Sequence, residues 1–441
     1  MPIGEDFARR LLPVLPAVVE HFGTPFHLYD EQGIQETCAA FDAAFGHLPF
    51  TEYFAVKALP NPTVLRLLAD HGYGFDCSSL PELALALRAG ARGDRICFTS
   101  NNTSRAELDA ALAAGALLNI DDEAVLDKLA DRPDRPGTLA FRVNPGARGR
   151  RSGSADAFLG NPEGAKFGVP ADRLTAVVAE AVRLGTTRFG LHMMLASNSL
   201  TAAPVLRTLD LLLEHAVELH RDLGVTVSFV NLGGGLGIPY RPGEQPLDLP
   251  ALGRALGERL DAWEREHGLP RPALAFESGR LITGPHGVLA TRVVNRMSKW
   301  REYAGVDAGM SALMRPALYP TAYHHITAPF TDAPAEPVDV VGSLCENNDR
   351  FAADRELPAL TEGDLLLVHD TGAHGHSMGF TYNGRLRPQE LLLRRDGAVE
   401  LIRRAEEERD HFATLDFTPD RLAARAGGLP SPEPQSAGLP G

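Results

Sequence analysis

The sequence predicts an α/β fold, a (β/α)8 TIM barrel followed by a second, mainly β domain. From about residue 35, short apolar strands alternate with helix-period stretches rich in Ala, Leu and Arg, which is typical of βα units around a parallel sheet. The alternation gives eight units, the number that closes a barrel. After about residue 285 the helical rhythm fades, and β-like runs such as 287–294 and 364–368 replace it.

The predicted barrel strands end in small or polar residues. In chain order, the strands end at Lys57, 76–79, 98–101, 119–121, 143–144, 191–193, 231–233 and 276–277. Because the active sites of such barrels lie at the C-terminal ends of the strands, we expect the chemistry of this protein to gather there.

The segments outside the barrel complete the predicted domain plan. We expect an N-terminal segment that contributes to the β domain (1–34), a barrel (35–285), a β-rich C-terminal domain (286–417) and a disordered tail rich in Pro, Gly, Ala and Ser (418–441). The fifth βα unit carries an insertion at 145–166, rich in Arg, Gly and Ser, which is a candidate lid over one mouth of the barrel.

Composition narrows the class of function. The net charge of −14 disfavours binding to nucleic acids or anionic membranes, so a small-molecule substrate is expected. The four cysteines are widely spaced without a CxxC pair, which predicts neither a disulfide framework nor a metal site. The N-terminus lacks a basic segment followed by an apolar one, and no stretch has the roughly 20 apolar residues of a membrane span, so we expect a cytoplasmic protein.

Lys57 ends the apolar run 53–56 and is followed by Pro60 and Asn61, which favour a turn. A lysine in this place either closes a strand as a solvated charge or forms a Schiff base with a carbonyl compound. The stretch alone leaves both interpretations open.

Two further motifs lie at other strand ends. Residues 231–237 form a glycine-rich loop that can cradle a phosphate through its N–H groups or simply make a tight turn. Glu277 and Arg280 supply a carboxylate for a protonated ring nitrogen and a guanidinium for a phosphate or carboxylate, or else they form a local ion pair. An imine-forming amine, an anion cradle and a ring-nitrogen partner on one barrel are what pyridoxal 5'-phosphate requires.

From about residue 25 to residue 395, the sequence resembles the fold-type III pyridoxal-phosphate decarboxylases, most of all the diaminopimelate decarboxylases. The matching motifs are Tyr53-Phe54-Ala55-Val56-Lys57, Gly74-Phe75-Asp76-Cys77-Ser78-Ser79, Lys166-Phe167-Gly168, Gly233-Gly234-Gly235, Glu277-Ser278-Gly279-Arg280, Asp307-Ala308-Gly309-Met310, Arg315-Pro316-Ala317-Leu318-Tyr319, Cys345-Glu346-Asn347-Asn348-Asp349 and Tyr382-Asn383. The resemblance implies an alanine racemase-like barrel.

The resemblance also implies roles for individual residues. Lys57 would be the Schiff-base lysine, and Cys345, donated by the neighbouring subunit of a homodimer, would protonate the carbanion after CO2 leaves. The implied cofactor-binding residues are Lys57, Asp76, His192, Ser197, Gly234, Gly235, Glu277, Gly279, Arg280 and Tyr382. The implied substrate-binding residues are Arg280, Arg315, Tyr319, Glu346 and His374.

Three positions depart from the usual motifs of these enzymes. Met194 replaces a histidine that stacks on the cofactor ring, His374 replaces a tyrosine, and Ser278 replaces a proline. A thioether can pack against a ring face but cannot titrate, and either His374 or His376 can take over from the tyrosine or be merely solvated. The changes gather at the active site, as in a paralogue with a shifted substrate or outcome.

The expected function is decarboxylation of an amino acid with a distal carboxylate or zwitterionic group, similar to diaminopimelate, through a Lys57 aldimine and a quinonoid intermediate. Arg315 with Tyr319 suits a distal carboxylate, whereas an ornithine-type enzyme would need a carboxylate there. The alternatives are an epimerase or racemase on the same fold and a non-catalytic, pyridoxal-phosphate-binding regulatory homologue. The sequence leaves lysine biosynthesis and a specialised pathway both open.

Overall fold

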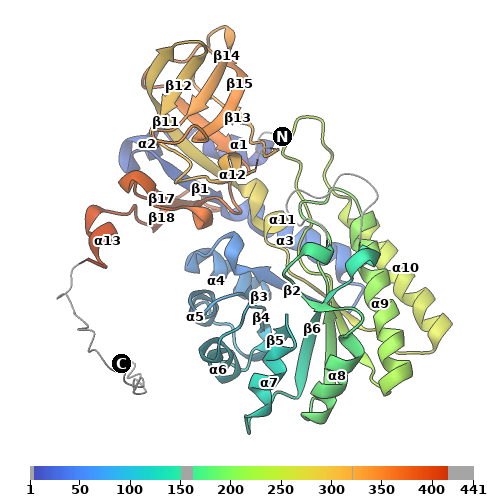
Figure 1. Cartoon of the computed structure of the whole chain (residues 1–441). Coiled ribbons are helices and arrows are strands. Elements are labelled where there is room, and N and C mark those ends of the chain that lie inside the picture. Colours follow the sequence, from blue (N-terminus) through green and yellow to red (C-terminus); the bar gives the residue numbers. More distant parts are fainter. Residues whose placement is uncertain (1–3, 150–161, 320, 416–441) are drawn as a thin grey trace, which may run out of the picture.

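The computed structural model describes residues 4–149, 162–319 and 321–415, which form a parallel barrel and a second, mainly β unit (Figure 1). The predicted tail and the central part of the candidate lid lie outside the described residues.

The barrel contains every strand that the sequence predicts. Its strands are β2 (Phe50–Ala55), β3 (Gly74–Cys77), β4 (Ile96–Phe98), β5 (Leu117–Ile120), β6 (Thr138–Asn144), β8 (Arg188–His192), β9 (Val227–Asn231) and β10 (Ala273–Phe276). They pair in the order β5-β4-β3-β2-β10-β9-β8-β6, and a further pairing of β5 with β6 closes the ring. The sequence did not predict β7 (Val169–Pro170), a short strand that pairs with the end of β6.

Helices cover the outside of the barrel (Figure 1). They are α3 (Glu31–Phe45), α4 (Pro62–His71), α5 (Leu80–Arg88), α6 (Arg105–Ala113), α7 (Ala124–Ala130), α8 (Leu174–Arg183), α9 (Ala203–Leu223) and α10 (Leu249–His267). Several of these helices have an N-cap side chain. Asn61 accepts a hydrogen bond from the N–H of Thr63 at the start of α4, and Ser104 forms a capping box with Glu107 at the start of α6.

The main core lies between the strands and these helices. Phe41 and Phe45 of α3 pack on Phe276 of β10, with ring centroids 5.5 and 4.8 Å from its centroid. Burying such large rings on one face of each helix supplies much of the stabilisation that holds the helices on the barrel.

The second unit is built on a mixed sheet with β15-β14-β12-β11-β1-β17-β18 as its main path. Off this path, β16 pairs with β11, and β13 pairs with β16. Its elements are α1 (Glu5–Leu11), α2 (Leu15–Phe22), β1 (Phe26–Asp30), β11 (Gly287–Ser298), β12 (Glu302–Val306), α12 (Arg315–Leu318), β13 (Ile326–Thr327), β14 (Ala335–Val341), β15 (Arg350–Pro358), β16 (Leu365–His369), β17 (Gln389–Leu393), β18 (Val399–Arg403) and α13 (Glu408–Phe412). The N-terminal strand β1 lies between β11 and β17. The division of the chain after residues 34, 285 and 417 stays a prediction.

A buried carboxylate connects the two units. Glu390 of β17 accepts from the hydroxyl of Tyr29 at 2.7 Å and from the amide of Asn61 at 3.0 Å, and it also pairs with Arg403. Because Asn61 follows the Lys57 turn, this network fixes the start of α4 against the second sheet. Among the described residues, no helix is long and apolar enough to cross a membrane.

Candidate active site

Lys57 lies in the single turn η1 (Val56–Ala58) that directly follows β2. Its Nζ donates to Oδ2 of Asp76, at the end of the neighbouring strand β3, over 3.2 Å. About half of the lysine side chain is exposed, whereas Asp76 is buried. The Asp76 carboxylate raises the pKa of Lys57, burial opposes that rise, and the charge of Glu277 adds to it. The amine therefore stands at the open, C-terminal end of the barrel beside an acid.

Asp76 and Glu277 form a close pair of buried acids beneath this lysine. Their carboxylate oxygens and the thiol of Cys97 lie within 4.8 Å of one another, and among the described residues these three form a group whose spacing fits a metal ion. Burial and the neighbouring Glu277 charge raise the pKa of Asp76 to about 7, although Lys57 opposes the rise. We expect the two acids to hold at most one proton between them, with the proton on Asp76 and Glu277 ionised.

Glu277 is held as an anion by its surroundings. Burial alone would raise its pKa, but His192, Lys57 and Arg142 together lower it to about 2. Its Oε1 accepts from the side-chain amide of Asn231 at 2.8 Å, and its Oε2 lies 3.5 Å from Nε2 of His192. An ionised carboxylate in a protein interior is what keeps a pyridinium nitrogen protonated.

Several polar atoms of this cluster lack a protein partner. Within the described part of the chain, Nδ1 of His192 and Oδ1 of Asp76 are buried and make no hydrogen bond, and Nε2 of His192 has only its 3.5 Å contact with Glu277. Buried polar atoms normally have partners, so this cluster is suited to a polar group that the chain itself does not supply.

The glycines of the 233–235 loop allow the backbone of neighbouring turns to approach where a side chain would collide. Gly233 and Gly235 have φ values of 66° and 89°, in the left-handed region that favours glycine. A Cβ at Gly234 would lie 2.6 Å from the carbonyl oxygen of Glu277, and a Cβ at Gly279 would lie 2.6 Å from Cβ of Ala58. The loop after β9 and the turn after β10 thus present bare backbone next to the Lys57 turn, which fits a phosphate cradle. Ser197, a predicted phosphate-binding residue, lies on the loop after β8 and is half-buried.

Two arginines contact Tyr240, a residue that was not predicted from the sequence, and form a cationic cluster around it. Arg280 donates to its hydroxyl at 2.6 Å, and the guanidinium carbon of Arg315 lies 4.3 Å from its ring centroid. Arg315 is 3% exposed and also donates to His324 at 2.9 Å, so its charge lies inside the protein and not on the surface. Tyr240 follows the glycine-rich loop closely, and this proximity is the one sequence signal that could have found it.

His374 belongs to the same region. Its backbone N–H donates to the carbonyl oxygen of Ala58 at 2.9 Å, which fixes it beside the Lys57 turn. Burial and the charges of Arg280, Lys57 and Arg315 lower the pKa of His374 well below its usual range, so its imidazole is neutral. His376 is not solvated, because it is buried and its Nε2 contacts the carbonyl oxygen of Pro388 at 3.0 Å.

The remaining predicted residues lie further out. Cys345 and Glu346 are exposed, Tyr382 is 49% exposed, and Tyr319 is half-buried at the end of α12. The Cys345 loop is nevertheless well anchored: Asp349 accepts from the N–H of Leu344 at 2.8 Å, and Asn383 accepts from the N–H of Cys345 at 2.8 Å. An exposed thiol on an ordered loop can be presented to another molecule.

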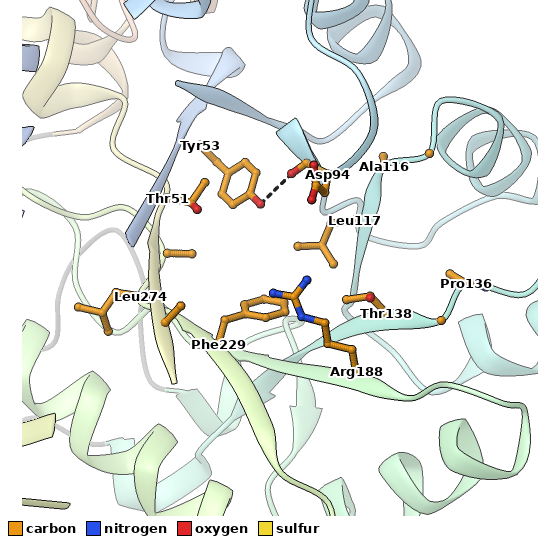
Figure 2. Close-up of a pocket in the computed structure, with 14 residues that line it drawn as sticks. Thr51, Tyr53, Asp94, Ala116, Leu117, Pro136, Thr138, Arg188, Phe229 and Leu274 are labelled. Carbon is orange, nitrogen blue, oxygen red and sulfur yellow. Dashed lines mark hydrogen bonds between the residues drawn. The ribbon is translucent and has the colours of Figure 1, made fainter. Parts of the chain in front are cut away.

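A separate cavity of about 330 Å³ lies at the opposite, N-terminal end of the barrel (Figure 2). There Tyr53 donates to the carbonyl oxygen of Asp94 at 2.9 Å, and Arg188 lies over the ring of Phe229 (Figure 2). None of the predicted site residues lines this cavity. The chemistry-bearing side chains are therefore concentrated at one end of the barrel.

Comparison with known proteins defines the class. Residues 31–284 match the family described as "Pyridoxal-dependent decarboxylase, pyridoxal binding domain", and the chain belongs to this family. Its cofactor is accordingly pyridoxal 5'-phosphate, and the amine, the buried anion and the glycine cradle of this site fit that group.

Individual relatives cover almost the whole chain. It is 50% identical over 422 residues to "Protein TabA" of Pseudomonas amygdali pv. tabaci, covering 95% of this chain and 97% of TabA. It is 37% identical over 417 residues to a diaminopimelate decarboxylase of Methanothermobacter thermautotrophicus, covering 92% and 95%. Its fold matches the crystal structure of diaminopimelate decarboxylase from Helicobacter pylori complexed with L-lysine, with a TM-score of 0.82, 28% identity and coverage of 91% and 99%.

Proposed function

We propose that this protein is a pyridoxal-phosphate-dependent decarboxylase that removes CO2 from an amino acid with a distal carboxylate or zwitterionic group, of the diaminopimelate kind. The observation that carries the proposal is the placement of the Lys57, Asp76 and Glu277 cluster next to the cationic cluster of Arg280, Tyr240 and Arg315. The first group suits the cofactor, and the second suits an anionic far end of the substrate.

Bound pyridoxal phosphate supplies an electron sink for the pair of electrons left at Cα when CO2 departs. Lys57 would hold the cofactor covalently through its amine. Glu277, ionised in the protein interior, keeps a proton on the ring nitrogen, so positive charge remains where electrons must flow. The backbone N–H groups of the 233–235 loop, with Gly279 and Arg280, would hold the phosphate of the cofactor.

At the substrate's far end, Arg315 and Arg280 bind a carboxylate, and Tyr240 keeps the two guanidinium groups apart and oriented. The neutral imidazole of His374 lies among these cations and can accept a hydrogen bond from the substrate without adding charge. Cys345 is proposed to give the proton that replaces CO2 at Cα.

We propose that Cys345 completes the site of the partner subunit in a homodimer, a role that its place on an exposed loop supports. Mixing Lys57→Ala with Cys345→Ala protein tests it directly. Random exchange makes half of the dimers mixed, each with one complete site, so about a quarter of wild-type activity should return. Activity that stays at the level of either single variant, with mixed dimers verified by mass, would contradict a shared site.

The substrate claim is tested by measuring CO2 release from meso-diaminopimelate, lysine and ornithine under identical conditions. We expect kcat/KM for diaminopimelate to exceed the values for lysine and ornithine by about a hundredfold or more, because only diaminopimelate has a distal carboxylate for Arg315. Arg315→Met should reduce that preference, and the exposed Arg95→Met serves as a matched control. A wild-type preference for lysine or ornithine would overturn the substrate assignment.

Two further proposals concern the cellular location and the metabolic pathway of the enzyme. We propose a cytoplasmic enzyme, supported by the soluble fold type and the absence of spanning helices among the described residues. We also propose lysine biosynthesis as the pathway in which a diaminopimelate-like substrate is consumed. Growth of a lysine auxotroph lacking its own decarboxylase tests this, and failure to grow despite a soluble, cofactor-loaded protein would count against it.

A further inference from the structure

Glu52 is an acidic residue buried in the wall of the barrel. It lies on β2, the strand that leads to Lys57, and pairs in register with Phe276 of β10. Its side chain is 2% exposed, and burial raises its pKa well above the usual range for a carboxyl group. Burying an acid in place of an apolar side chain is costly, so its contacts require an explanation.

The explanation lies in the turn that follows β10. Oε1 of Glu52 accepts from the backbone N–H of Ser278 at 2.6 Å, and Ser278 is also 2% exposed. Within the described part of the chain, Oε2 of Glu52 and Oγ of Ser278 make no hydrogen bond. Each of these two residues is thus the main polar partner of the other.

Ser278 stands between residues that face the cofactor and the substrate. Glu277 precedes it, and its carboxylate bonds to Asn231. Gly279 and Arg280 follow it, and Arg280 bonds to Tyr240. A displacement of the Ser278 backbone would therefore move both the ring-nitrogen partner and one guanidinium of the cationic cluster.

We propose that Glu52 is a positioning residue, whose bond to the N–H of Ser278 holds the 277–280 turn so that Glu277 and Arg280 keep their orientation toward cofactor and substrate. The inference rests on the proposed roles of those two residues. The bond also requires a residue other than proline at position 278, because proline has no N–H to donate.

The test is a double-mutant cycle with Glu52→Leu and Ser278→Pro, accompanied by the conservative Glu52→Gln and Ser278→Ala. Glu52→Leu leaves the Ser278 N–H buried without a partner, and Ser278→Pro leaves the acid without a donor. Glu52→Gln keeps an acceptor oxygen, and Ser278→Ala keeps the N–H. The measurements are the dissociation constant of pyridoxal phosphate, the absorption band of the bound cofactor as a function of pH, kcat and KM separately, and thermal unfolding of the cofactor-free protein.

We expect Glu52→Leu and Ser278→Pro each to weaken cofactor binding about tenfold and to shift the pH dependence of the cofactor band, because Glu277 is displaced. Glu52→Gln and Ser278→Ala should stay within about threefold of wild type. The double variant should bind the cofactor no more weakly than the worse single variant, because the leucine and the proline together leave no unpaired group.

Independent effects that multiply in the double variant would overturn the proposal, as would a Glu52→Leu protein that melts earlier but binds the cofactor with unchanged affinity and absorption. If Glu52→Leu does not fold, Ser278→Pro and Ser278→Ala decide the matter alone, and equal cofactor binding by these two contradicts it. Cofactor affinity does not depend on which substrate is turned over, so a failure of the substrate assignment remains distinguishable from a failure of this inference.

Discussion

Glu277 and Glu390 are both buried carboxylates whose surroundings lower the pKa to about 2, yet they lie in different kinds of polar cluster. Around Glu390, the hydroxyl of Tyr29, the amide of Asn61 and the guanidinium of Arg403 all reach the carboxylate. Around Glu277, Nδ1 of His192 and Oδ1 of Asp76 are buried and make no hydrogen bond within the described chain. A cluster is complete when all of its buried polar atoms have hydrogen-bond partners, and such a cluster stabilises the fold. An incomplete cluster at the mouth of a barrel has polar atoms left to bind a ligand.

The largest effect should come from removing the amine of the incomplete cluster. Lys57→Ala is expected to reduce kcat by about a thousandfold or more, because covalent attachment of the cofactor is lost. Since the lysine side chain is about half exposed, the free energy of unfolding should change by less than about 1 kcal/mol. Steady-state kinetics and denaturant titration measure the two quantities. The exposed Lys299→Ala provides the control, and equal activity of the two variants would refute the role of Lys57.

Replacing the two glutamates by glutamine separates their roles. Glu277→Gln should lower kcat about a hundredfold, because the ring nitrogen loses its anionic partner, while the cofactor-free protein keeps its stability within about 1 kcal/mol. Kinetics on the cofactor-loaded variant and chemical denaturation of the cofactor-free variant provide the comparison. A large loss of stability with an unchanged kcat would show that Glu277 has a structural role and not a catalytic one.

Glu390→Gln should show the opposite pattern. Breaking a buried charged network typically costs 3 to 5 kcal/mol, but Arg403 is about a third exposed, so we expect about 2 to 3 kcal/mol. Activity of the folded fraction should stay within about threefold of wild type. Urea unfolding measures the first quantity, and a kcat defect as large as that of Glu277→Gln would remove the contrast between the clusters.

The pH dependence of stability sharpens this contrast. The folded pKa of Glu390 is about 2, below its ordinary value of 4.5, so its contribution is complete above pH 4.5 and is lost as pH falls toward 2. The free energy of unfolding should therefore fall less steeply between pH 4.5 and 2 in Glu390→Gln than in wild type. Identical slopes in this range would show that the network does not hold the carboxylate as an anion.

The smallest effect is expected at His374. Because its pKa lies well below the usual range, kcat/KM should show no titration of this residue near pH 6.5, and His374→Gln should keep the wild-type pH profile while changing KM less than about tenfold. Loss of a limb near pH 6.5 in the variant would show that His374 carries a functional proton.

The sequence predicted the barrel well because each strand ended at a recognisable change from apolar residues to glycine or polar residues, as at Lys57 and 276–277. Lys57 and Glu277 were predicted together for the same reason, since parallel strands bring their ends to one rim, whereas Asp76 was implied only by the family resemblance. Tyr240 and the bond between Glu52 and Ser278 were missed. They depend on packing between segments far apart in the sequence, and no local pattern marks a tyrosine or a buried acid as a partner.

The central claim is that the site removes CO2, and one measurement tests it most directly. Cofactor-loaded protein is incubated with meso-diaminopimelate in D2O, and the products are followed by mass spectrometry. The account predicts stoichiometric CO2 and lysine with a single deuterium at the carbon that lost its carboxylate. Deuterium entering recovered diaminopimelate without CO2 release would contradict it and identify an epimerase, and no reaction of any tested amino acid would favour a regulatory homologue.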